Sequence, residues 1–244
     1  MPLDILCLAP HPDDAELCCG GLLLKAKQAG KSIGVIDFTA GEMGTRGSDE
    51  LREQEVAASS RLLKVDAREN LKLRDGYLLS EPGLLAAIVT VLRRYRPKWV
   101  LAPHWEDSHP DHEAVGKAVL RAAFMAGVPK YEPQSAGGVA SPDELPYRPQ
   151  LVLHYNNRYM IDADMVLDIS DVFEQKLELT ACFATQFGPG EGSHAGPQTK
   201  LSHSNFYEWL RGIHTFYGYK IGARYGEPYC VKGPIKMDGL LSEL

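Results

Sequence analysis

Two short segments of the chain combine histidine and carboxylate side chains around a proline. The first runs from His11 to Glu16 with the sequence H-P-D-D-A-E, and the second runs from His109 to Glu113 with the sequence H-P-D-H-E. Imidazole and carboxylate are ligands that suit zinc and similar divalent ions, and a catalytic zinc site commonly uses three protein ligands and a water. Brought to one place, the two segments would supply a metal centre for hydrolysis.

The first segment carries two adjacent carboxylates, Asp13 and Asp14. Neighbouring side chains cannot both point the same way from a regular strand, so we expect one to bind the metal. The other would face the attacking water and accept its proton. A single segment of this kind is more often a helix cap than a site. Two of them are hard to explain by capping alone, and the pair favours a metal site.

The elements that must position these segments alternate between strand-like and helix-like. Short apolar runs predict strands over 5–9, 32–38, 70–73, 99–102, 151–155 and 165–169. Amphipathic spacing and end signals predict helices over 15–29, 49–64, 83–95, 111–126 and 171–184. This alternation is typical of right-handed βαβ units on a mainly parallel sheet. We therefore predict an α/β, Rossmann-like three-layer fold, with a single domain over residues 1–244.

Ligands of such sheets bind beyond the carboxyl ends of the strands. The loops over 10–16 and 103–111 follow the first and the fourth predicted strands, so both belong to that edge. The proline-rich stretch over 129–149 predicts a long loop. Residues 186–204, rich in glycine, serine and histidine, predict a mobile loop that borders the site.

Composition argues against several classes of protein. The formal net charge of −6 and the lack of a basic run disfavour binding to nucleic acid. No apolar run approaches the roughly 18 residues that span a membrane, and the N-terminus lacks a signal-peptide pattern. Five cysteines at unpatterned spacings argue against a disulfide framework. We expect a cytoplasmic protein that acts on a small molecule.

The motifs resemble those of a known family. Residues 9–16, with two glycines at 20 and 21, are similar to the A-H-P-D-D-x-E signature of the LmbE-like (PIG-L) zinc N-deacetylases, and residues 109–112 resemble their second motif. Residues 39–42 and 52–55 match the T-x-G-E loop and the R-x-x-E helix of that family. Residues 221–227 are similar to the I-G-x-x-Y-A/G-E segment of one branch, the N-acetylglucosaminyl-malate deacetylases of bacillithiol biosynthesis.

The resemblance implies a division of roles within the site. Three residues would bind Zn²⁺ or another divalent ion: His11, Asp14 and His112. Asp13 would act as the general base. His109 would stabilise charge in the transition state or protonate the leaving amine. Asp111 would orient an imidazole of the site, as carboxylates beside metal-binding histidines do.

Four residues are candidates for binding the substrate. Arg52 resembles a substrate-binding arginine whose donors suit malate carboxylate or sugar hydroxyls, and an ion pair along its own helix is the alternative. Asp75 is a candidate contact for a sugar hydroxyl, although an aspartate before glycine is equally a turn. Arg148 is a candidate contact for a carboxylate, and Glu42 of the T-x-G-E loop completes the set.

One position departs from the pattern of the branch. Some members carry a tyrosine, proposed to polarise the amide carbonyl, where the alignment places Phe206. Tyr207 is adjacent but would face elsewhere if the segment is helical. The oxyanion role would then fall to zinc and His109, or to His194 or His203, although a solvated loop is the simpler interpretation of these last two.

The predicted activity is zinc-dependent hydrolysis of the acetamide of an N-acetylated amino sugar. We expect N-acetylglucosaminyl L-malate as the substrate and a homo-oligomer as the assembly. The alternatives are another N-acetylglucosamine conjugate (inositol-linked, chitobiose-type or antibiotic) or an inactive metal-binding module. The presence of Asp13 and His109 argues against the inactive module, because metal binding needs neither. The lack of a G-x-G-x-x-G pattern disfavours a nucleotide-binding domain.

Overall fold

The centre of the protein is a five-stranded parallel sheet. The computed structural model describes residues 2–135, 138–139, 145–156, 160–189 and 196–235. The sheet has the order β3-β2-β1-β4-β7, and each neighbouring pair is parallel. Its strands are β1 (Ile5–Ala9), β2 (Ile33–Asp37), β3 (Ala67–Asn70), β4 (Trp99–Pro103) and β7 (Leu151–Tyr155). The predicted α/β fold with a mainly parallel sheet is confirmed.

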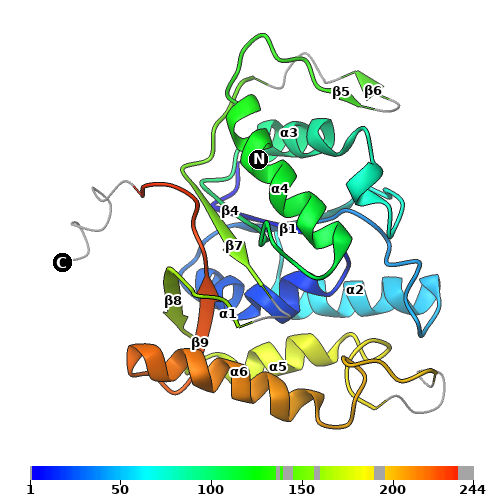
Figure 1. Ribbon diagram of the computed structural model, residues 1–244, viewed down its shortest axis with the longest axis vertical. Helices are drawn as coiled ribbons and strands as arrows, with labels where there is room; N and C mark the ends of the chain where they lie inside the picture. The colour runs from blue at the N-terminus through cyan, green and yellow to red at the C-terminus, as the bar shows by residue number, and fades with distance from the viewer. Residues whose placement is uncertain (1, 136–137, 140–144, 157–159, 190–195, 236–244) are drawn as a thin grey trace.

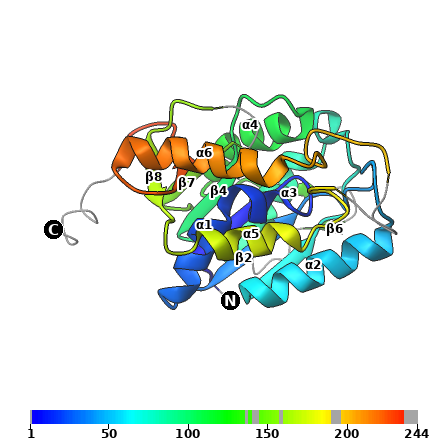
Figure 2. The same ribbon diagram turned by 90° about the horizontal axis from the view of Figure 1, so that it is seen from below.

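Helices cover both faces of the sheet (Figure 1). One face carries α1 (Asp14–Gln28) and α2 (Asp49–Leu63), and the other carries α3 (Leu84–Tyr95), α4 (Pro110–Met125) and the short η1 (Leu78–Ser80). Figure 2 shows α5 (Phe173–Ala181) and α6 (Phe206–Ile221) lying outside α1. Two antiparallel ribbons complete the fold: β8 (Met165–Asp168) with β9 (Gly226–Tyr229), and β5 (Gln134–Ser135) with β6 (Gly138–Val139). No described helix has the length and apolar character to cross a bilayer.

The central strand β1 is buried along its whole length. Cys7 and Ala9 pack into the apolar cluster beneath α1 and α5, whereas Leu6 and Leu8 pack into the cluster beneath α3 and α4. A strand covered on both faces by helices needs apolar residues at every position, which is why this segment is a continuous apolar run.

Two local predictions need correction. The third strand lies at Ala67–Asn70 rather than at 70–73, because it is an edge strand whose residues are half-buried and largely polar. The apolar signal comes from Leu71 and Leu73, which follow the strand and pack against the cluster of α3 and α4. Within the predicted 129–149 loop, β5 and β6 pair as a short ribbon. The segment after residue 204 is helical, as the interpretation of Tyr207 required, and forms α6 from Phe206 onward.

The strand order determines where a site can form. The chain runs outward from β1 through β2 to β3 on one side, and from β4 to β7 on the other. The loops that follow β1 and β4 therefore diverge in opposite directions and leave a crevice at the carboxyl edge, the usual ligand site of such sheets. The two His/Asp segments begin in these loops and continue into the first turns of α1 and α4.

Candidate active site

The loop after β1 contains a strained residue. Asp13, which precedes α1, has φ 143° and ψ −22°, whereas the other described non-glycine residues with positive φ have values of 45° to 54°. Arg52 of α2 holds this corner, because its Nη1 donates to the Pro12 carbonyl at 2.6 Å and lies 3.3 Å from Asp13 Oδ2. Strain of this kind persists where surrounding contacts fix it, and it is common at functional sites.

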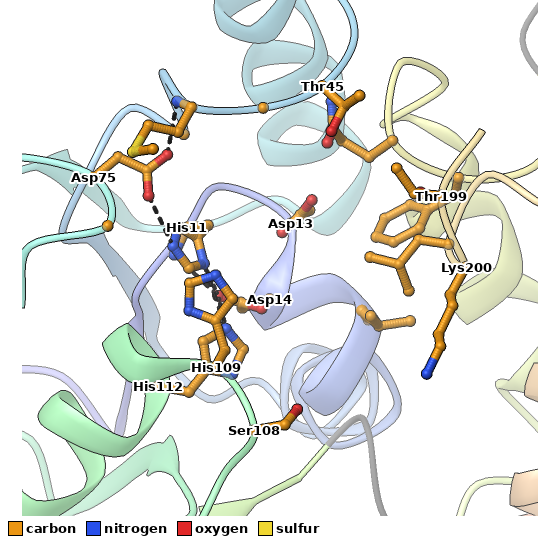
Figure 3. A pocket seen from close by; sticks show the side chains of 18 of the residues that line it. His11, Asp13, Asp14, Thr45, Asp75, Ser108, His109, His112, Thr199 and Lys200 are labelled. Atoms are coloured by element: carbon orange, nitrogen blue, oxygen red, sulfur yellow. Dashed lines mark hydrogen bonds and ion pairs between the residues drawn. The ribbon is translucent and has the colours of Figure 1, made fainter. Parts of the chain in front are cut away.

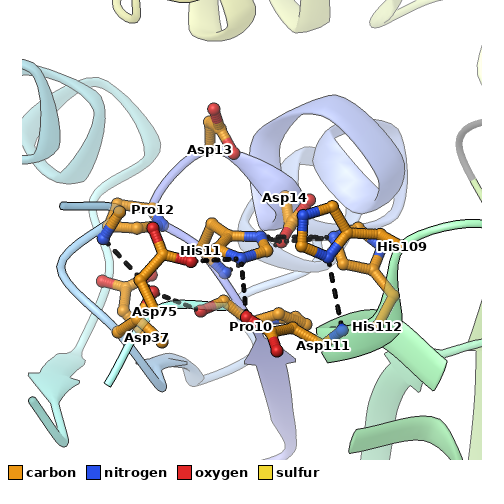
Figure 4. Close-up of polar contacts among 12 residues, drawn as sticks. Pro10, His11, Pro12, Asp13, Asp14, Asp37, Asp75, His109, Asp111 and His112 are labelled. Atoms are coloured by element: carbon orange, nitrogen blue, oxygen red, sulfur yellow. Dashed lines mark hydrogen bonds and ion pairs between the residues drawn. The ribbon is translucent and has the colours of Figure 1, made fainter. Parts of the chain in front are cut away.

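Three side-chain atoms from the two His/Asp segments converge on one point (Figure 4). Asp14 Oδ2 lies 3.3 Å from His11 Nδ1 and 3.2 Å from His112 Nε2, and the two nitrogens are 3.3 Å apart. The Asp14 carboxylate is fixed in this orientation by the backbone N–H of His11, which donates to Oδ2 at 2.9 Å. Asp14 and His112 are buried, with 3% and 2% of their surface exposed, so the three atoms form a rigid triangle.

The triangle has the dimensions of one face of a tetrahedral zinc site. Zinc–nitrogen and zinc–oxygen distances of about 2.0–2.1 Å place the corners of a tetrahedron roughly 3.3–3.4 Å apart. An ion seated on His11, Asp14 and His112 would keep its fourth position for water or substrate. Two looser groups, His11 with His109 and His112 and His11 with Asp75 and Asp111, have ligand atoms within 4.8 Å of one another. The tighter triangle fits a metal better than either of them.

The second nitrogen of His11 contacts two carboxylates. His11 Nε2 lies 3.2 Å from Asp75 Oδ1 and 3.4 Å from Asp111 Oδ2. A proton held on Nε2 by these acceptors leaves Nδ1 unprotonated and directed at the triangle, which is the tautomer that metal binding requires. Asp111 also accepts hydrogen bonds from the N–H groups of Gly76 and Leu78, at 2.7 and 3.0 Å, so it fixes the loop that carries Asp75.

Asp107 is the carboxylate that faces the second nitrogen of His112, as Asp75 and Asp111 do for His11. Its Oδ2 lies 3.5 Å from His112 Nδ1, and its Oδ1 accepts from the backbone N–H of His109 at 2.8 Å. Asp107 is not among the site residues predicted from the sequence. The available signal was its place in the loop after β4, two residues before the H-P-D-H motif.

His109 stands beside the triangle as the N-cap of α4. Its ring centroid lies 4.7 Å from that of His11 and 5.1 Å from that of His112. Its Nδ1 accepts a hydrogen bond from the backbone N–H of Asp111 at 3.3 Å. An accepting Nδ1 places the ring proton of a neutral imidazole on Nε2, so this tautomer makes His109 a donor.

The electrostatics separate the two adjacent carboxylates. Burial raises the pKa of Asp13 to about 7, although the positive charge of Arg52 opposes the shift. Burial also acts to raise the pKa of Asp14, but His112 and His11 outweigh it and hold that pKa well below its usual range. One carboxylate therefore stays ionised beside the imidazoles, while the other can exchange a proton near neutral pH.

These groups line one end of a cavity of about 760 Å³. Figure 3 shows the imidazoles, Asp14 and Asp75 on one side, with Thr199 and Lys200 across the opening. The remaining walls come from the loop after β2, the start of α4, the segment before α6, and Trp209 of α6. Gln186, Phe187 and residues 199–201 belong to these walls, so the predicted 186–204 loop does border the site.

The four predicted substrate contacts lie in different places. Arg52 and Asp75 line the cavity, but Glu42 does not, because it accepts from the N–H groups of Ala40 and Asp75 and so supports the wall. Arg148 is exposed, donates to the Phe124 carbonyl at 3.4 Å, and is not among the lining residues. The structure therefore brings two of the four to the cavity.

Among the described residues weighed for the oxyanion role, His109 lines the cavity, whereas Phe206, Tyr207 and His203 do not. Phe206 is 2% exposed and stacks on Phe187 with ring centroids 4.9 Å apart. Neither Tyr207 nor His203 lines the cavity, and His203 is exposed. His194 lies outside the described residues. His109 is thus the candidate for this role that stands beside the triangle.

Comparisons with known proteins identify the family. The sequence profile of PIG-L, described as GlcNAc-PI de-N-acetylase, matches residues 6–123. The diacetylchitobiose deacetylase of Thermococcus kodakarensis is 31% identical over 233 residues, which cover 91% of this chain and 80% of that protein. A probable N-acetyl-alpha-D-glucosaminyl L-malate deacetylase 2 of Bacillus cereus is 25% identical over 90% of this chain and 99% of its own length.

A solved structure extends the likeness to the whole fold. A conserved protein from Thermus thermophilus has a TM-score of 0.81 and 33% identity, and the match covers 96% of both chains. The chain belongs to the PIG-L (LmbE-like) family of deacetylases. Its relatives include proteins named for chitobiose, for N-acetylglucosaminyl malate and for an inositol conjugate, so the malate branch is one of several.

Proposed function

We propose that this protein hydrolyses the acetamide of an N-acetylated amino-sugar conjugate, with zinc as its metal. The observation that carries the proposal is the triangle of His11 Nδ1, Asp14 Oδ2 and His112 Nε2, with edges of 3.2 to 3.3 Å. When bound there, a divalent ion supplies Lewis acidity and an acidified water. The residues around the triangle supply what amide hydrolysis further needs, a proton acceptor and a donor to the oxyanion.

Asp13 is the proton acceptor. It lines the cavity but is separate from the triangle, and Figure 4 shows its carboxylate apart from the imidazoles. Its pKa of about 7 suits a group that accepts a proton from the attacking water and later releases it. The strained backbone and the contact with Arg52 fix the direction of the carboxylate, which is the geometric requirement for a general base.

His109 donates to the developing oxyanion through Nε2–H. Its Nδ1 accepts from the backbone N–H of Asp111, so the neutral ring presents Nε2–H without first binding a proton. A fixed donor aimed at developing charge is among the strongest sources of catalysis. The same contact disfavours an imidazolium, so the stabilising role is better supported than the proton-donating one.

Asp13 carries one proton from the attacking water to the leaving nitrogen. Water adds to the acetamide carbon and gives its proton to Asp13, and the carbonyl oxygen becomes an oxyanion that accepts from His109. The C–N bond then breaks, and Asp13 returns the proton to the departing nitrogen. The products are acetate and a free amino sugar.

We propose N-acetylglucosaminyl L-malate as the physiological substrate. The Bacillus cereus relative, which this chain matches along nearly its whole length, carries that substrate in its name. A neutral disaccharide, diacetylchitobiose, is the second candidate, because the Thermococcus relative is 31% identical. A cavity of about 760 Å³ is large enough for either, since small-molecule sites commonly enclose about 300–1,000 Å³.

Amine release from defined substrates tests the proposal. The zinc-loaded protein is incubated with N-acetylglucosaminyl L-malate, N-acetylglucosaminyl inositol, diacetylchitobiose and N-acetylglucosamine, and primary amine and acetate are quantified. Equimolar acetate and amine, with the highest kcat/KM for the malate conjugate, are expected. Asp13→Asn protein with the same zinc content is the matched control. Wild-type protein that holds zinc but releases no acetate from any of the four would contradict the proposed activity.

A further inference from the structure

The wall of the cavity opposite the metal triangle has its own chemistry. Figure 3 shows Thr199 and Lys200 across the opening from the imidazoles of His11, His109 and His112. The same wall is completed by Leu201 and by the indole of Trp209. None of these residues takes part in the proposed hydrolysis, so the wall is free to contact the rest of a substrate.

Lys200 is presented by an ordered turn. The backbone N–H of Thr199 donates to Ser202 Oγ at 2.7 Å, and the N–H of Ser202 donates back to Thr199 Oγ1 at 3.2 Å. Ser202 is buried, with 2% of its surface exposed. The Leu201 carbonyl accepts from the N–H of Gly188 at 3.0 Å, which ties the turn to the segment beside it. The backbone that carries Lys200 is therefore fixed before a ligand binds.

The arginines near this wall are already engaged. Arg52 donates to Pro12 and pairs with Asp13, whereas Arg46 donates to the carbonyls of Gly188 and Pro197 at 3.2 and 3.1 Å. Within the part of the chain that the structure describes, Lys200 makes no ion pair. Its ammonium is thus a cation of the cavity wall that remains available to an anion.

A second hollow adjoins the cavity at Lys200. This hollow of about 410 Å³ shares Lys200 and Trp209 with the cavity and is otherwise lined by His203, Asn205 and Phe206. Trp209 is 44% exposed although it is a large aromatic residue. An exposed indole that lines both hollows offers a flat apolar surface on which a ring or a carbon chain can lie.

We propose that Lys200 and Trp209 form a subsite for the group attached to the anomeric carbon of the amino sugar, and that this group carries a carboxylate. The inference rests on the proposed deacetylation, which places the acetamide at the metal triangle, so that the group on the neighbouring anomeric carbon extends across the cavity toward this wall. The Lys200 ammonium neutralises the carboxylate, and Trp209 covers the apolar part of the group. Arg148, which lies away from the cavity, takes no part.

Substrate discrimination in Lys200 variants tests the subsite. The kcat/KM values for N-acetylglucosaminyl L-malate and for neutral diacetylchitobiose are measured with zinc-loaded wild-type, Lys200→Ala, Lys200→Arg and Lys200→Glu proteins. Lys200→Ala should lower the malate-to-chitobiose ratio about 10-fold, which corresponds to 1.4 kcal/mol. Lys200→Glu should lower it further, and Lys200→Arg should restore most of it. The loss should lie in KM, because Lys200 acts on binding rather than on the reacting atoms.

Salt and a distant lysine provide the controls. Raising the ionic strength should raise the KM of the wild-type protein for the malate conjugate and affect Lys200→Ala much less, because an exposed ion pair is screened. Lys31→Ala, at an exposed position after α1, should keep the wild-type ratio. An unchanged ratio in Lys200→Ala and Lys200→Glu, with deacetylation intact, would overturn the subsite alone. No acetate from either substrate in the wild type would instead overturn the proposed function.

Discussion

Arg52 Nη1 donates to the carbonyl of Pro12 at 2.6 Å and lies 3.3 Å from Asp13 Oδ2, so one guanidinium holds both the backbone and the side chain of the strained corner. Arg52 is itself fixed by Glu55, whose carboxylate lies 3.7 Å away and accepts from the N–H and hydroxyl of Thr185. From its sequence motif, Arg52 is predicted to bind substrate. The contacts of Arg52 instead favour a role in positioning Asp13.

A double-mutant cycle separates the two roles of Arg52. Arg52→Ala should lower kcat roughly 10- to 100-fold on charged and neutral substrates alike, because the general base loses its orientation. Asp13→Asn should lower kcat about 100-fold or more, and Arg52→Ala added to it should cost little, since coupled residues are not additive. Arg61→Ala, at an exposed position of the same helix, is the control. A KM increase confined to the malate conjugate would show that Arg52 binds substrate instead.

The role of His109 can be tested by replacing its donor. His109→Ala should lower kcat about 100- to 1,000-fold, the usual loss when an oxyanion donor is removed. His109→Gln keeps a side-chain N–H and should retain at least about ten times the activity of the alanine variant. Zinc content is measured in both variants to exclude loss of the metal. Equal activity of the two variants would favour a proton-transfer role for the imidazole.

A buried ion pair anchors the helix that carries Asp14. Lys176 Nζ of α5 lies 2.5 Å from Glu227 Oε2 of β9, and neither side chain is exposed. The Glu227 carboxylate also accepts from the backbone N–H groups of Gly21 and Leu22 in α1, at 2.9 and 2.8 Å. A Cβ at position 21 would lie 2.8 Å from this carboxylate. The close contact between Gly21, which follows the first motif, and Glu227, in the C-terminal segment, therefore depends on the glycine.

Removal of one partner of this pair should be costly. Glu227→Gln keeps the shape of the side chain but leaves the Lys176 ammonium buried without a carboxylate, so it should lower the free energy of unfolding by about 3–5 kcal/mol. Lys176→Met in the same protein removes the stranded charge and should recover part of the loss. Denaturant unfolding measures both. A double variant less stable than Glu227→Gln would contradict this account of the pair.

The free energy of unfolding should decrease as the pH is lowered, because His214 binds a proton more readily in the unfolded chain. Burial, with a contribution from the charge of Lys176, lowers the pKa of this histidine from 6.5 to about 3. Between these values the unfolded chain binds a proton that the folded protein does not, so the free energy of unfolding decreases as pH falls from 6.5. A single group contributes at most about 1.4 kcal/mol per pH unit. Its Nδ1 lies 2.8 Å from the Gly226 carbonyl, a contact that a glutamine amide can replace.

The measurement is the change of unfolding free energy between pH 7 and pH 5. His214→Gln should show a shallower decrease than the wild type, whatever its stability at pH 7. The exposed His203, changed to Gln, should keep the wild-type slope. Equal slopes in all three proteins would mean that His214 does not titrate in this range.

The fold and the placement of the two motifs follow from local sequence. The runs at β1 and β4 are apolar because both faces are covered, and each ends in a motif loop, so the sequence predicts both the sheet and the edge where the loops meet. The convergence of His11, Asp14 and His112 in the structure agrees with this expectation. Binding of the metal itself stays a prediction, as does the expected homo-oligomer.

Contacts between distant segments could not be predicted in this way. Asp107 is one acidic residue in a polar loop, and only the folded geometry places it against His112. The contacts between Glu227 and α1 join residues that are 205 and 206 positions apart in the sequence. Arg148 follows a long proline-rich stretch whose path no local periodicity defines, so its distance from the cavity was not foreseeable.

The most direct test of the account is a zinc titration of the metal-free protein followed by deacetylase activity. Wild-type protein stripped with a chelator should be inactive on N-acetylglucosaminyl L-malate, and activity should rise linearly to a plateau at one zinc per chain. A His11→Ala, His112→Ala double variant should neither retain the ion nor recover activity, because it lacks two of the three ligands. Full activity in the stripped wild type, or one tightly held zinc in the double variant, would contradict a catalytic metal bound by His11, Asp14 and His112.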